Sequence, residues 1–115
     1  DATVTQLFLD NVSALCTIAD NTSYAFTVRI IGRRTDAVGG VADYLFTGTL
    51  SRDVGAATTA IIGTVAKQVV SETDAAWDAD VDADTTGGAL RIQVTGEALK
   101  TIRWNARIDL VEVSN

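Results

Sequence analysis

The sequence predicts an all-β protein, an antiparallel β-sandwich of jelly-roll-like character with about eight strands. β-Branched residues recur along the whole chain, and such residues favour the pleated, half-buried surface of a sheet. Apolar and polar residues alternate with a period of two in nearly every segment, and turn residues separate these segments. With 115 residues, the chain is expected to form a single domain over residues 1–115.

The first four expected strands cover residues 3–9, 12–18, 23–34 and 41–52. In the second, Cys16 alternates with Ala14 and Ile18, so we expect its side chain to be a small buried hydrophobe. The third and fourth strands alternate aromatic and aliphatic residues with small or charged ones. Turn residues at 36–40 are expected to join these two strands in a hairpin.

The remaining expected strands cover residues 58–70, 76–84, 89–95 and 100–113. The first is ambiguous because its Ala and Val residues fit either a helical or a strand period, but Gly63 favours a strand with a bulge. Turn residues at 53–55, 85–88 and 96–97 separate these runs. Long strands without Pro expose edges that invite pairing, which is a weak argument for an oligomer.

The composition argues against most classes of enzyme. The chain has no His, which removes His-based nucleophile systems and imidazole zinc sites, and its single Cys excludes a disulfide framework. No carboxylate pair stands out as a glycosidase pair. We therefore expect no catalytic residues and no cofactor. The first residue is Asp1 rather than Met, which suggests a piece of a longer chain.

The charge and the hydropathy pattern limit the partners. A net charge of −6 makes nucleic-acid binding an unfavourable hypothesis, because phosphate neutralisation dominates such affinities. No apolar run is long enough to span a membrane, so we expect no membrane insertion.

Four aspartates alternate with apolar residues near the sixth expected strand, which puts Asp78, Asp80, Asp82 and Asp84 on one face. One hypothesis is a calcium site at Asp80, Asp82 and Asp84, since hard cations bind clustered oxygens. The match to an EF-hand loop fails further on, because Thr85 and Arg91 stand where that loop needs Gly and Glu. The favoured interpretation is a solvent-facing row that pairs across strands with Arg91, Arg103 and Arg107.

Aromatic side chains and a charged hairpin are the other candidate binding features. The aromatic residues lie in the apolar register of their strands, so we expect them in the core rather than on a sugar-binding surface: Tyr24, Phe26, Tyr44, Phe46, Trp77 and Trp104. Arg33, Arg34 and Asp36 stand at a hairpin end in an acidic chain. The arginines are suited to an acidic sugar or a carboxylate. The favoured interpretation is nevertheless a charged hairpin tip or an inter-subunit ion pair.

Three segments resemble bacteriophage tail-fibre and tailspike proteins: residues 24–36, residues 76–96, and residues 101–107 followed by Val111-Glu112-Val113. The resemblance covers roughly residues 20–113. It implies a C-terminal β-sandwich tip domain that forms a homotrimer in the virion. Residues 1–20 fall outside it, as a connection to an upstream fibre shaft or as additional strands.

The function implied by this resemblance is binding to a glycan or protein on the host cell surface, together with trimerisation of the fibre. The family supplies no catalytic residues. Receptor contacts are expected in exposed loops near Arg33, Arg34, Asp36 and Asp53. Two alternatives stay open: a purely structural trimerisation or decoration domain of the virion, and a secreted carbohydrate-binding module.

Overall fold

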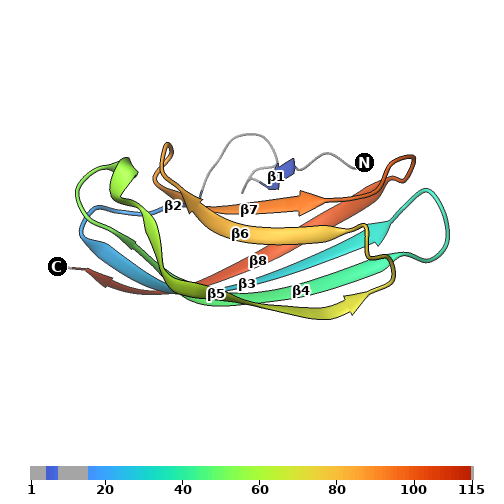
Figure 1. The fold of residues 1–115 in the computed structure, drawn as a ribbon, viewed down its shortest axis with the longest axis horizontal. Coiled ribbons are helices and arrows are strands. Elements are labelled where there is room, and N and C mark those ends of the chain that lie inside the picture. The colour runs from blue at the N-terminus through green and yellow to red at the C-terminus, as the bar shows by residue number, and fades with distance from the viewer. Residues whose placement is uncertain (1–4, 8–15, 115) are drawn as a thin grey trace.

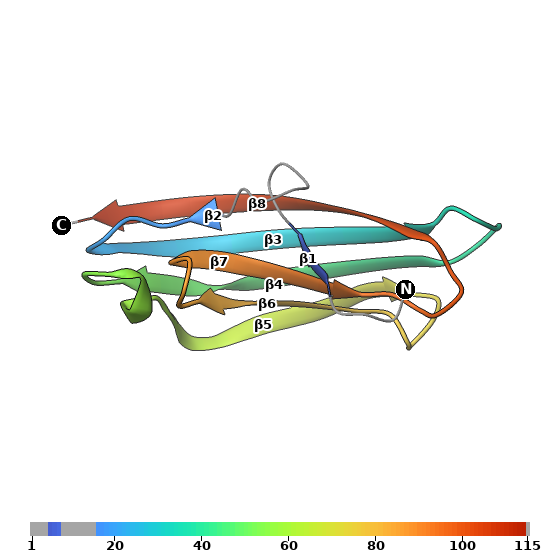
Figure 2. The ribbon, with the colours of Figure 1, turned by 90° about the horizontal axis from the view of Figure 1, so that it is seen from above.

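The computed structural model describes residues 5–7 and 16–114, which form two antiparallel sheets stacked face to face (Figure 1). The described part measures 49 × 26 × 18 Å, and the strands run along its longest dimension (Figure 2). The predicted antiparallel sandwich is thereby confirmed. Its elements are β1 Thr5–Leu7, β2 Cys16–Thr17, β3 Thr22–Arg34, β4 Val41–Arg52, the 3-10 turn η1 Ala56–Thr58, β5 Ala60–Glu72, β6 Asp78–Asp84, β7 Ala89–Thr95 and β8 Ile102–Ser114.

The larger sheet, here called sheet B, has the strand order β5-β4-β3-β8. Three successive strands form hairpins, and β8 then returns to lie beside β3, which is a Greek-key arrangement. The register between β3 and β8 runs without a break from the pair Thr22 and Ser114 to the pair Arg34 and Ile102. The register between β4 and β5 contains two shifts, one of them near Gly63. Gly63 has φ +77°, so the bulge expected at this glycine is present.

The smaller sheet, sheet A, is built around β7, which pairs with β6 along one edge. Along its other edge, β7 pairs with β1 near Ile92–Val94 and with β2 near Ala89–Leu90. β1 and β2 lie within the expected strands 3–9 and 12–18, and the rest of those two ranges lies outside the described residues. The expected strands from residue 23 onward match β3 to β8 with ends that differ by two residues at most.

The core lies between the sheets and is formed by every second residue of the central strands. Phe26, Val28, Tyr44, Phe46 and Trp77 are all buried there, so the expectation that these aromatic residues belong to the core is confirmed. Trp104 is half-buried, and its ring meets that of Trp77 edge-on with centroids 6.0 Å apart. Cys16 is also half-buried against the core, and this burial raises the pKa of its thiol.

The loops that connect the long strands lie at the two ends of the sandwich. Residues 35–40, 73–77 and 96–101 lie at one end of the sandwich, which we call the hairpin end. The loop with η1 and the turn between β6 and β7 lie at the opposite end, together with Ser114 of β8 (Figure 1). In the described residues, no helix is long and apolar enough to cross a membrane.

Candidate functional site

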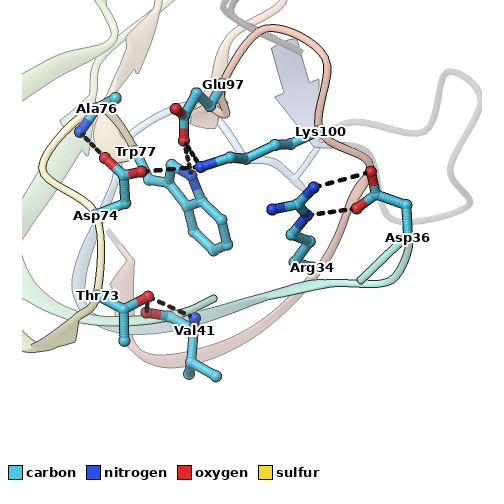
Figure 3. A network of polar contacts seen from close by, with 9 residues as sticks. All are labelled: Arg34, Asp36, Val41, Thr73, Asp74, Ala76, Trp77, Glu97 and Lys100. Atoms are coloured by element: carbon cyan, nitrogen blue, oxygen red, sulfur yellow. Dashed lines mark hydrogen bonds and ion pairs between the residues drawn. The ribbon is translucent and has the colours of Figure 1, made fainter. Parts of the chain in front are cut away.

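Polar side chains from two loops meet at the hairpin end and form what we call the loop-end network (Figure 3). The indole Nε1 of Trp77 donates a hydrogen bond to Glu97 at 3.3 Å, and Lys100 donates to the same carboxylate. Lys100 also binds Asp74 at 3.1 Å, so one ammonium connects the β5–β6 loop with the β7–β8 loop. The network consists of Asp74, Trp77, Glu97 and Lys100, and Arg34 and Asp36 form a separate ion pair nearby.

Hydrogen bonds stabilise the charged forms of the groups in this network. Asp74 accepts a hydrogen bond from the backbone N–H of Ala76, and this bond, with the contacts to Glu97 and Lys100, lowers the pKa of Asp74 to about 2. The bonds to Glu97 and then Asp74 raise the pKa of the Lys100 ammonium. The ion pair of Asp74 and Lys100 therefore stays charged over a wide range of pH and holds the two loops together.

The structure separates the two arginines expected to form one receptor site. Arg34 donates to the Asp36 carboxylate at 2.6 and 3.4 Å, and this pairing lowers the pKa of Asp36. Arg34 and Asp36 thus form an ion pair with each other at the hairpin tip. Successive side chains of a strand point to opposite faces of the sheet, so Arg33 and its neighbour Arg34 point to different sides of β3. Arg33 is exposed and lies on the outer face of sheet B.

The fourth predicted contact residue, Asp53, lies at the far end of the sandwich, because β4 runs the length of the molecule between residues 41 and 52. Its backbone N–H binds the Thr58 hydroxyl at 2.9 Å, and its carbonyl oxygen accepts from Asn21 at 3.0 Å. The structure therefore does not bring Asp53 together with Arg33, Arg34 or Asp36.

The predicted row of aspartates is present on the outer face of β6, and hydrogen bonds involve most of its members. Asp82 forms a bidentate pair with Arg91 at 2.8 and 2.6 Å across β6 and β7, as expected for cross-strand pairing. Asp84 accepts from the backbone N–H groups of Thr86 and Gly87 at 3.0 Å, which lowers the pKa of Asp84. Asp78 pairs with Lys67 of β5.

Two other expectations for this row need correction or lack support. Arg103 and Arg107 lie on β8 in the other sheet, so they are not the partners of these aspartates. The described residues also contain no group of three or more acidic, His or Cys side chains that is able to hold a metal ion. Nothing in the arrangement of Asp80, Asp82 and Asp84 therefore supports the calcium hypothesis.

A second group of arginines gathers on the outer face of sheet B. Arg29 lies directly opposite Arg107 in the register of β3 and β8, and Arg33 lies directly opposite Arg103. We call these four residues the arginine face. Two carboxylates accompany them: Asp43 binds Arg29 at 3.1 and 2.7 Å, and Asp109 contacts Arg107 at 3.3 Å. In the described part of the chain, Arg33 and Arg103 form no ion pair.

A shallow hollow of about 340 Å³ lies beside Arg29 and Arg107 of the arginine face. It is lined by residues from three strands: Arg29, Ile31, Asp43, Asn105, Ala106 and Arg107. Ile31 is 49 % exposed and faces Asn105 across the strands, so an apolar surface lies between the two arginine pairs.

Local alternation places these residues on the polar side of their strands, but it does not make them neighbours. Only the pairing of β3 with β8 brings Arg29 and Arg33 beside Arg107 and Arg103. The sequence contains a usable signal, namely two arginine pairs with the same four-residue spacing in opposite strands, Arg29 with Arg33 and Arg103 with Arg107. This signal predicts a shared surface only when the order of the strands in the sheet is known.

No family model, no curated protein and no solved structure matches this chain. The geometry of the sheets, the loop-end network and the arginine face are therefore the observations on which a functional proposal rests, beside the resemblance of the segments described above.

Proposed function

We propose that this chain is a tip domain of a bacteriophage tail fibre or tailspike, which binds the host cell surface and associates with two further copies of itself. The observation that carries the proposal is the exposure of two valines on the outer face of sheet B, toward the end of β8, a part of the face that we call the apolar end. Val111 and Val113 are 70 % and 71 % exposed there. β8 is the edge strand of its sheet, so both its side chains and its backbone edge are available to a partner.

The apolar residues continue across the sheet rather than standing alone. Val111 is opposite Ala25, Ala25 is opposite Thr49, and Thr49 is opposite Ile62, which is 56 % exposed. A surface of this kind is stabilised when a second copy covers it, and symmetric packing of identical chains is the usual solution. The number three comes from the resemblance to trimeric fibre tips.

The other end of the same face has a different chemistry that suits binding to a host surface. Arginines and exposed loops lie there, and rigid strands support them. In this proposal the apolar end serves assembly and the hairpin end serves adhesion, in the virion and outside the cell. The proposal involves no catalysis and no cofactor.

Light scattering of the purified chain tests assembly. We expect a mass of three chains at micromolar concentration, and Val111→Lys with Val113→Lys should reduce it to one chain. The matched control is Val38→Lys with Val54→Lys, because these valines are similarly or more exposed but lie in loops. A wild-type monomer, or dissociation of the control variant as well, would contradict the proposed interface.

Binding of the fluorescently labelled chain to a panel of bacterial strains tests adhesion. We expect saturable binding to a subset of strains, and a loss of that binding when Arg33 and Arg34 are both replaced by Ala. A stable trimer that binds no strain would instead favour the purely structural virion domain. Saturable binding of a soluble sugar by a monomer would favour the secreted carbohydrate-binding module.

A further inference from the structure

The arginine face contains two like-charged pairs, and one of them, Arg33 with Arg103, has no carboxylate partner among the described residues, whereas Arg29 and Arg107 each contact one carboxylate. The Cβ atoms of directly opposite residues in an antiparallel pair lie about 4.5–5.5 Å apart, and like charges at that distance repel one another. Arg29 faces Arg107 and Arg33 faces Arg103. Four of the chain's nine basic residues are thus gathered on one face of two adjacent strands, in a protein with net charge −6. Such a gathering is unfavourable for the isolated fold, and a bound anion would relieve it.

Several N–H donors of the arginine face form no hydrogen bond among the described residues. A guanidinium has five N–H donors, and Arg29 uses only two of them on Asp43. Arg103 and Arg33 form no ion pair among the described residues, so their donors point to solvent. Asp43 shows how an anion is held here, because its carboxylate accepts two parallel hydrogen bonds from one guanidinium.

The spacing of the pairs indicates a ligand with dispersed charge. The two pairs are four residues apart along each strand, which is about 13 Å. Duplex DNA carries one charge about every 1.7 Å, so a nucleic acid would bring far more negative charge than this face neutralises and would be repelled by the rest of the chain. A polymer with one carboxylate in each short repeat matches the spacing better.

A second copy of the chain is a less suitable occupant of this face. The acidic surface that it would offer is the β6 row, where Asp78 and Asp82 already pair with Lys67 and Arg91. Asp84 is held by backbone N–H groups of its own turn. Of this row only Asp80 forms no hydrogen bond or ion pair among the described residues, so a single carboxylate is left there for the unpaired Arg33 and Arg103.

We propose that the arginine face binds an acidic polysaccharide whose repeats carry uronic-acid carboxylates. The carboxylates lie on the two arginine pairs, while Ile31 and Asn105 between them contact the apolar and hydroxyl groups of the intervening sugar. This inference rests on the proposed function as an adhesion domain and names the class of its receptor. It differs from a site at the hairpin tip, because Arg34 is paired with Asp36 and takes no part.

Biolayer interferometry on immobilised polygalacturonate tests the proposal. We expect saturable binding of the wild-type chain that weakens as salt is added. Binding should be absent on the same polymer after its carboxyl groups have been reduced to alcohols. Arg33→Gln with Arg103→Gln should weaken binding about tenfold or more, the loss expected when charge-assisted hydrogen bonds are removed.

The matched control variant is Lys67→Gln with Arg91→Gln, which changes the net charge by the same amount on β5 and β7, away from the arginine face on β3 and β8. We expect it to bind polygalacturonate like the wild type. The thermal stability of the double arginine variant should equal or exceed that of the wild type, so that its loss of binding is not explained by unfolding.

Three results would overturn the proposal: equal binding to the reduced polymer, an equal loss in the control variant, or unchanged binding after Arg33 and Arg103 are replaced. A change in the mass of the arginine variant would identify the face as an interface between copies instead. A monomer that binds polygalacturonate would contradict the proposed trimer but not this inference. A trimer that binds bacteria only through neutral glycans would contradict this inference but not the proposed trimer.

Discussion

Gly32 lies beneath the indole ring of Trp104, its direct partner across β3 and β8. A Cβ atom added at Gly32 would be 2.5 Å from Cζ3 of that ring. The absence of a side chain at Gly32 therefore lets the ring lie flat on the strand and reach Trp77 edge-on. The contact fixes the two strands to each other directly behind Arg33 and Arg103.

Gly32→Ala should therefore destabilise the protein by about 1–3 kcal/mol, the range for overpacking a well-filled site. Urea unfolding provides the measurement. In a Trp104→Phe background, the smaller ring leaves room for the added methyl group, so the same change should cost less. Strictly additive effects of the two substitutions would show that the ring does not constrain Gly32.

The stability of the protein should decrease as the pH falls from about 4 to 2, in part because of Asp74. The pKa of Asp74 is lowered from 3.8 to about 2 in the folded state, so its contribution is complete above the higher value and is lost as the group protonates near the lower one. Asp74→Asn keeps an acceptor for Ala76 but loses the charge.

We therefore expect Asp74→Asn to be less stable than the wild type at neutral pH and to become equal to it only as the pH falls below about 2. Melting temperatures across this range check the prediction. Asp80→Asn is the control, because Asp80 forms no hydrogen bond or ion pair within the described part of the chain. A constant difference between wild type and Asp74→Asn at all pH values would contradict the assignment.

Thr59→Val should stabilise the protein by about 1 kcal/mol. Thr59 is 2 % exposed, and its hydroxyl has no hydrogen-bond partner among the described residues, so it has lost water without compensation. Valine has nearly the same shape. Thr58→Val is the opposite case, because that hydroxyl binds the backbone around Asp53 and Gly55, and it should lower stability. Chemical denaturation of both variants decides the point.

Arg103→Thr should raise the free energy of unfolding by about 0.2–1 kcal/mol, because it removes the repulsion from Arg33 on the opposite strand. Arg91→Thr should lower it by a similar amount, because Arg91 pairs with Asp82. Added salt should reduce both differences. If both variants were destabilised equally, loss of the aliphatic stem rather than charge would be the cause.

The strands themselves were predictable because apolar and polar side chains alternate with a period of two within each segment. The expected strands 41–52 and 89–95 coincide with β4 and β7. The outward row on β6 and the buried position of Trp77 follow from the same alternation. The 3-10 turn at 56–58 was not expected, because it depends on the Thr58 hydroxyl bonding back to the loop rather than on periodicity.

The partners of these side chains were not predictable from local patterns. Asp82 and Arg91 lie in one hairpin, so their pairing follows from the turn at 85–88. Arg103 and Arg107 were expected near the aspartates, but the Greek key moves β8 into the other sheet. The same crossing creates the arginine face. Which sheet a strand joins depends on the packing of the whole chain, and the sequence of a short segment does not determine it.

The Greek key also determines the order of events when the chain folds. Thr22 pairs with Ser114, so sheet B is complete only after almost the entire described chain has been made and β6 and β7 have crossed over. Contacts so distant in sequence form slowly, typically in milliseconds to seconds for all-β domains. During that interval the edge of β3 is open to the β8 segment of any neighbouring copy. Dilution during refolding should therefore favour closure within one chain, whereas crowded nascent chains should exchange their last strands.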